Sequence, residues 1–197
     1  MKNKLFLVLL AAPLLLTGCN SEASSNTKES FHEMVAAFKV EDAQAKYASG
    51  KEVSSGVLTI GVEPEEGVKA ADLFALTGFA EHEATEKEIA NADFASYMME
   101  EQKIAEVEEL VKDKAIEVTY EASETESSVY VTVSESNYKL GEYEVGYAQY
   151  TGYFFNEVGL LTKIDHSYGY AQQSEDQTDP TITFAFREII EYTWTLK

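Results

Sequence analysis

The sequence predicts an α+β fold, in which N-terminal helices pack on one face of a curved antiparallel β-sheet. Apolar residues repeat at helical spacing up to about Lys114 and at every second residue from Ala115 onward. Polar or glycine-containing segments of no more than eight residues separate these alternating stretches, which is typical of an antiparallel meander. Residues 30–197 are numerous enough to bury a hydrophobic core of their own, so we expect a single domain there.

Three helices are expected in the first part of the chain. Ser30 and Glu33 match a capping box, and apolar residues at helical spacing follow them, so a helix should begin there and end near Gly50. A short helix is predicted for residues 68–76, followed by a glycine as its end signal. The strongest amphipathic pattern covers residues 93–114, which have one apolar and one acidic face.

Strand-like alternation marks one early segment and five later ones. These segments are residues 57–62, 116–120, 129–133, 142–155, 158–172 and 181–196. The last five predict an antiparallel meander, with a tight turn at Asn156 and Glu157. Because long strands in a small sheet must coil, the predicted sheet is curved.

The first 18 residues have the features of an export signal. Lys2 and Lys4 precede an apolar run at residues 5–16, which is too short to cross the hydrocarbon core of a membrane. The run ends in Leu16-Thr17-Gly18-Cys19, which resembles the lipobox of bacterial lipoproteins. That resemblance implies cleavage before Cys19 and a diacylglycerol on its thiol, so that acyl chains such as palmitate anchor the protein.

The chain should therefore have three parts. Residues 1–18 are the signal peptide, residues 19–29 are the lipidated cysteine with a Ser-rich flexible tether, and residues 30–197 are the domain. Two acyl chains would hold the protein stably on a membrane. We expect it in the cell envelope, on the extracytoplasmic face of a bacterial membrane.

Charge and cysteine content exclude several classes of protein. The formal net charge is −20, and Arg187 is the only arginine, so nucleic acid is not an expected partner. One cysteine excludes a disulfide framework and a cysteine-rich metal site, and no cofactor motif is present. Crowded carboxylates also predict raised carboxyl pKa values, and hence greater stability near pH 5 than near pH 8.

Element order alone gives a further resemblance. Helices followed by an antiparallel meander are similar to the cone of cystatin-like folds and to the half-barrel of lipid-carrying lipoproteins. This resemblance covers the order of elements and no individual residues. It implies a sheet whose helix-bearing face either is filled by the helices or stays open to a ligand.

His166 and Glu188 interrupt two apolar rows on neighbouring predicted strands. By alternation, His166 shares a face with Tyr168 and Tyr170, and Glu188 lies in a row of aliphatic and aromatic residues. Three interpretations are open. The two side chains form a general acid/base pair or a structural buried pair, or a bulge near Arg187 turns Glu188 into solvent.

Tyrosines are concentrated in the predicted meander, which holds ten of the twelve. Tyr143, Tyr147 and Tyr153 share one face of their strand. Cross-strand packing in an ordinary core explains them. Alternatively they line a pocket for an apolar or amphipathic ligand, together with His166, Glu188, Tyr168 and Tyr170.

The motifs of common enzymes are absent, including Gly-x-Ser-x-Gly, phosphate-binding glycine loops and His-Glu-x-x-His. The sequence therefore favours a membrane-anchored, non-catalytic domain that binds a ligand or an envelope protein. The alternative is a small cone-fold enzyme that uses His166 with Asp165 or Glu188.

Overall fold

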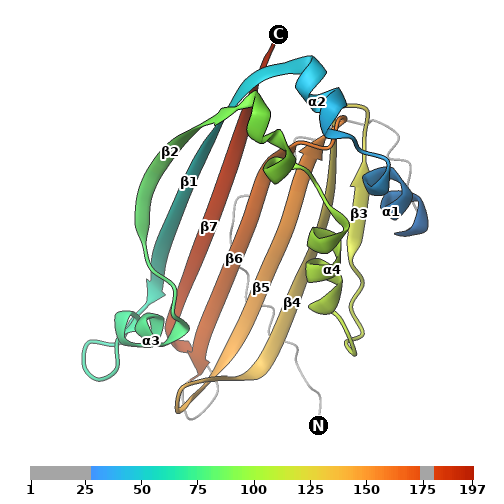
Figure 1. Cartoon of the computed structure of the whole chain (residues 1–197). Helices are drawn as coiled ribbons and strands as arrows, with labels where there is room; N and C mark the ends of the chain where they lie inside the picture. Colours follow the sequence, from blue (N-terminus) through green and yellow to red (C-terminus); the bar gives the residue numbers. More distant parts are fainter. Residues whose placement is uncertain (1–27, 174–179) are drawn as a thin grey trace.

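The computed structural model describes residues 28–173 and 180–197, and within them it shows helices on one face of a seven-stranded antiparallel sheet (Figure 1). The helices are α1 (Lys28–Ala36), α2 (Val40–Lys46), α3 (Ala70–Thr77), the 3-10 helix η1 (Asn91–Tyr97) and α4 (Glu101–Glu109). The strands are β1 (Tyr47–Val62), β2 (His82–Ala90), β3 (Thr119–Ala122), β4 (Glu126–Leu140), β5 (Tyr143–Asn156), β6 (Leu161–Gln173) and β7 (Pro180–Leu196). The predicted α+β class is confirmed. The signal, the lipobox and the tether up to residue 27 lie outside the described residues.

Strand order in the sheet is β2-β1-β7-β6-β5-β4-β3, with antiparallel pairing throughout. The five-stranded meander predicted from the sequence is therefore present as β3 to β7. Two further strands extend it, because β1 pairs with the last strand β7 and β2 forms the edge beyond β1. Strands β1 and β7, which lie far apart in the sequence, are thus neighbours, with β1 between β7 and the edge strand β2 (Figure 1).

The first predicted helix is wrong in its length. It starts at Lys28, breaks after Ala36, resumes as α2 and gives way to β1 at Tyr47. Gly50, expected as the end signal, is a strand residue that pairs with Trp194. A Cβ atom at position 50 would lie 2.4 Å from the Trp194 ring, so this glycine allows the indole to pack on the strand.

The predicted helix over residues 93–114 is divided into η1 and α4. Met98 forms a bridge to Leu160, and the Met99 N–H donates to the carbonyl of Gly159 at 2.7 Å. Because these backbone groups pair with the β5–β6 turn, they cannot continue a helix. Tertiary contacts therefore override the amphipathic pattern at this point.

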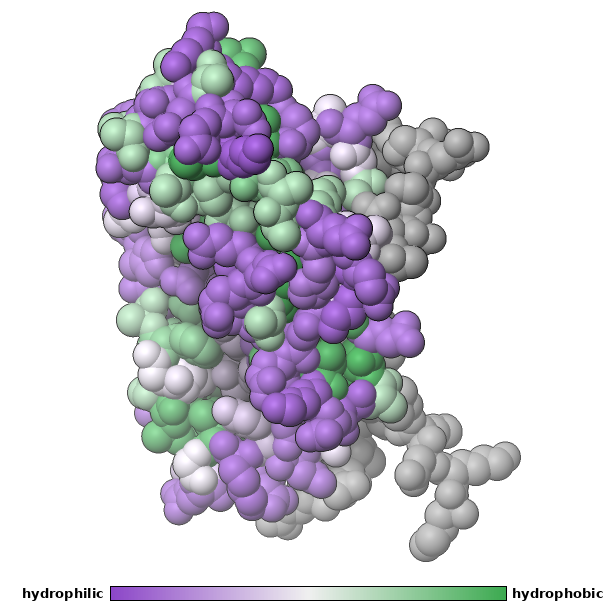
Figure 2. Space-filling view, turned by 45° about the vertical axis from the view of Figure 1, so that its right-hand side comes forward, coloured by the Kyte–Doolittle hydropathy of each residue, from purple (hydrophilic) through white to green (hydrophobic). Residues whose placement is uncertain are grey.

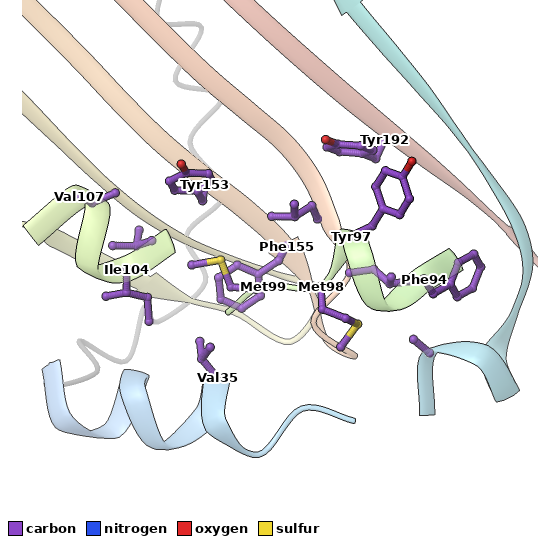
Figure 3. Packing of buried hydrophobic residues seen from close by; sticks show 14 of the residues in the cluster. Val35, Phe94, Tyr97, Met98, Met99, Ile104, Val107, Tyr153, Phe155 and Tyr192 are labelled. Carbon is purple, nitrogen blue, oxygen red and sulfur yellow. The ribbon is translucent and has the colours of Figure 1, made fainter. Parts of the chain in front are cut away.

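All the helices that contact the sheet do so from one side, the helix-bearing face (Figure 1). At one end of the sheet, α1, η1 and α4 bury side chains such as Val35, Phe94 and Ile104 against Tyr153 and other strand residues (Figure 3). At the other end, α3 forms a second and smaller apolar cluster with residues of β4 to β7. None of the helices in residues 28–173 and 180–197 is long and apolar enough to cross a membrane.

Candidate functional site

Strand register places the predicted pocket residues on the helix-bearing face. Tyr147 pairs with Tyr170, and Thr151 pairs with His166, so odd positions of β5 and even positions of β6 share a face. His166 pairs in turn with Glu188 of β7. The full set on this face is Tyr143, Tyr147, Tyr153, His166, Tyr168, Tyr170 and Glu188.

A row of residues crosses five strands in the middle of this face. From β2 to β5 it contains His82, Gly56, Glu188, His166 and Thr151, each opposite the next in the ladder. We call it the central row. The β6–β7 register is continuous from Lys163 to Gln172, so no bulge rotates Glu188 to the other face.

His82 is one member of the central row that sequence reasoning did not select. Its ring lies over Gly56, where a Cβ atom would stand 2.8 Å from the imidazole Cδ2. The missing side chain lets the ring reach across β1, so that His82 Nε2 lies 4.0 Å from Glu188 Oε1. A glycine within the alternating part of β1 was the available signal, because such glycines mark close approach of another group.

Hydrogen bonds run along β5 to the central row. The Tyr147 hydroxyl donates to Gln149 Oε1 at 2.8 Å, and Gln149 Nε2 donates to Thr151 Oγ1 at 3.0 Å. Thr151 Oγ1 also lies 3.4 Å from His166 Nδ1. Burial lowers the pKa of His166 despite the opposing effect of Glu188, so the imidazole is neutral at neutral pH.

Asp165 lies on the opposite face from His166, since adjacent strand residues point to opposite sides. Its carboxylate accepts hydrogen bonds from Arg187 Nε at 3.1 Å and Nη2 at 2.7 Å, and Lys163 Nζ lies 2.9 Å away. Although burial acts to raise it, these cations hold the Asp165 pKa below its usual value. The structure therefore corrects the sequence-based pairing of His166 with Asp165.

Aromatic side chains flank the central row. Toward α3, the Phe79 ring stacks on Phe186 at a centroid distance of 4.9 Å and lies 4.4 Å from Tyr168. Toward α4, Tyr153 meets His166 edge-on at 6.0 Å, and its hydroxyl donates to Glu106 Oε2 at 2.6 Å. Aromatic rings thus lie on both sides of the polar groups of the central row.

No described helix covers the middle of this face, since α3 lies at one end and α1, η1 and α4 lie at the other and along one side (Figure 1). The side chains of His82 and Glu188 are 36% and 41% exposed. Figure 2, in which the right-hand side of Figure 1 comes forward, shows mostly hydrophilic side chains with several hydrophobic groups between them. Hollows of about 480 and 410 Å³ lie beside Met98 and beside Leu76, near the two ends of the sheet.

Among residues 28–173 and 180–197, no three His, Cys, Asp or Glu side chains are grouped so that they could hold a metal ion. Comparison with protein-family models, curated proteins and solved structures finds no match for the chain.

Proposed function

We propose that this protein is a lipid-anchored, extracytoplasmic binding protein that holds a small ligand on the middle of its helix-bearing face. The observation that carries the proposal is the central row, where partly exposed polar side chains lie between aromatic rings and no described helix covers them. Sites of this kind combine apolar walls with a few polar groups that orient the ligand. The lipid anchor at Cys19 would hold the domain at the membrane surface.

A neutral fluorescent probe tests the binding role. The chain without its first 19 residues keeps every described element, and we expect it to bind N-phenyl-1-naphthylamine with an increase in fluorescence. Ser54 lies on the helix-bearing face, where it pairs with Ile190, and the adjacent Ser55 lies on the other face. Ser54→Trp should obstruct the site and lower probe affinity at least fivefold.

Ser55→Trp is the matched control, because it adds the same ring to the same strand on the opposite face. Its affinity should stay within twofold of the parent chain, with both variants folded by circular dichroism. Equal affinities in the two variants, or no binding by the parent chain, would refute a ligand site on the helix-bearing face.

The anchor is tested separately. We expect Cys19→Ala to yield a protein without lipid, whose signal is uncut or cut elsewhere, because the lipobox lacks its acceptor thiol. Mass spectrometry of the N-terminus and partition between membrane and soluble fractions measure this. An unmodified N-terminus at another residue in the unsubstituted protein would contradict the lipoprotein assignment.

A second candidate function is the cone-fold enzyme. It is favoured by three side chains that lie opposite one another on neighbouring strands: Thr151, His166 and Glu188. A neutral imidazole beside a hydroxyl can act as a general base. Thr151 is only 4% exposed, however, and Glu188 is directed toward His82. Hydrolysis of p-nitrophenyl acetate that disappears in His166→Gln would favour the enzyme over the binding role.

A further inference from the structure

We propose that the ligand of the central row is an organic cation, meaning an ammonium or amidinium group carried on an aromatic or otherwise apolar body. This inference rests on the proposed binding function and specifies its ligand class. Three properties of the helix-bearing face support it: an excess of carboxylates, a partly exposed acidic side chain beside aromatic rings, and an ammonium group that the fold already holds in this way.

Carboxylates outnumber cations along this face, at the central row and on both sides of it. Glu52 pairs with Tyr192, Glu135 pairs with Tyr147, and Glu188 pairs with His166 on the strands, while Glu106 reaches Tyr153 from α4. Lys87 is the cation that pairs with Glu52 on the same face. The local charge is thus negative, which attracts a cationic ligand.

The fold uses its nearby cations elsewhere. Arg187 and Lys163 both point to the opposite face, where they neutralise Asp165. Their charges are therefore committed to a buried carboxylate and do not balance Glu188. An external cation on the helix-bearing face would supply the missing charge.

Glu188 is placed to receive such a cation. Its side chain is 41% exposed, and the ionic contact that it makes within the described chain is to His82 at 4.0 Å, which is longer than a hydrogen bond. Next to it, Phe186 is buried under Phe79, and Phe79 is partly exposed. A cation held by the carboxylate could therefore rest its apolar body on Phe79 and gain a cation–π contact.

Lys87 shows that this face stabilises an ammonium group. Its Nζ lies over the Tyr97 ring at 5.4 Å from the centroid and donates to the Tyr97 hydroxyl at 2.8 Å. The hydrogen bond to Tyr97, with the nearby Glu52 and Asp93 charges, raises the Lys87 pKa. Aromatic rings and carboxylates thus act together on a cation that the chain itself provides.

Three benzyl compounds that differ in charge test the inference. Isothermal titration of the chain without its first 19 residues should show that benzyltrimethylammonium binds at least tenfold more tightly than benzyl alcohol and that benzylsulfonate binds weakest. Raising the salt concentration should weaken only the cation, since screening acts on charge. Glu188→Gln should lower affinity for benzyltrimethylammonium at least fivefold and reduce its advantage over benzyl alcohol.

Glu191→Gln is the matched control, because Glu191 lies on the same strand but opposite Lys163 on the other face. It should not change the affinity for the cation. Binding of N-phenyl-1-naphthylamine without any preference for benzyltrimethylammonium would overturn the ligand class and leave the binding function standing. A cation preference that Glu188→Gln and Glu191→Gln reduce equally would overturn the assignment to Glu188.

Discussion

We expect Arg187→Leu to lower the free energy of unfolding by about 2–3 kcal/mol. The Asp165 side chain is 4% exposed and is held by two hydrogen bonds from Arg187. Removing the guanidinium leaves a buried carboxylate with Lys163 as its remaining cation, and breaking a buried pair is costly because one charge stays uncompensated. Urea unfolding followed by circular dichroism measures the change.

Two comparisons separate this effect from a general loss of charge. Lys139→Leu removes a cation from the exposed pair with Glu144, whose side chains are 64% and 62% exposed, and should leave the free energy of unfolding almost unchanged. Adding Asp165→Asn to Arg187→Leu should restore part of the lost stability, because the buried charge is then gone. If Lys139→Leu and Arg187→Leu cost the same, the Asp165 pair does not stabilise the fold.

Strand periodicity was the most informative signal in the sequence. The alternation after Ala115 predicts the meander, and the structure confirms it as β3 to β7. The N-terminal hairpin was largely missed. Of the nine residues of β2 only Ile89 is buried, so this edge strand has no apolar alternation to detect.

Helix lengths could not be read from local pattern because distant residues determine them. The Gly159 carbonyl accepts a hydrogen bond from the Met99 N–H, which interrupts the helix predicted for residues 93–114. Trp194 packs on Gly50, which is a strand residue and not the end of a helix. Both partners lie far along the chain from the segments that they alter. A capping box or an amphipathic face describes a segment by itself and does not include such contacts.

The candidate site was partly accessible to sequence reasoning. Alternation placed His166 and Glu188 on one face, because their strands continue without a bulge between them. His82 and Thr151 were missed, because they become neighbours of the pair only through the order of β2, β1, β7, β6 and β5. The alternation rule by itself places Asp165 and His166 on opposite faces, because they are adjacent residues of one strand. The predicted pairing of His166 with Asp165 conflicts with that rule.

The carboxyl pKa values of the described chain that shift clearly do so in the opposite direction from the one that net charge alone predicts. Crowding among like charges predicts raised carboxyl pKa values. In the described chain, the four carboxyl groups with a clear shift all have lowered pKa values, and each has a cation as a partner; they are Glu108, Glu144, Glu157 and Asp165. Greater stability near pH 5 than near pH 8 stays a prediction, and these four groups do not contribute to it.

Glu108 of α4 connects this helix with α1 and β3 through hydrogen bonds and ion pairs. Its Oε1 accepts from Lys28 Nζ at 2.9 Å, lies 3.0 Å from His32 Nε2, and accepts a short hydrogen bond from the Tyr120 hydroxyl. Burial acts to raise its pKa, but these partners lower it from 4.5 to about 2. The carboxylate therefore ties α1 and β3 to α4.

We expect Glu108→Gln to lower the free energy of unfolding by about 1–2 kcal/mol at pH 7, because the charged acceptor of these bonds is lost. The Glu108 pKa is lower in the folded state, so the folded chain binds fewer protons between pH 4.5 and about 2. Its contribution is therefore complete above pH 4.5 and disappears as the pH falls toward 2. The difference in unfolding free energy between Glu108→Gln and the parent chain should accordingly shrink at pH 2.5.

Glu109→Gln is the control, because Glu109 is an exposed neighbour that binds Lys112, and it should have little effect at either pH. Urea unfolding of dilute protein at pH 7 and pH 2.5 measures both differences, and an equal loss at the two pH values would show that the Glu108 charge is not what holds α1 and β3 to α4.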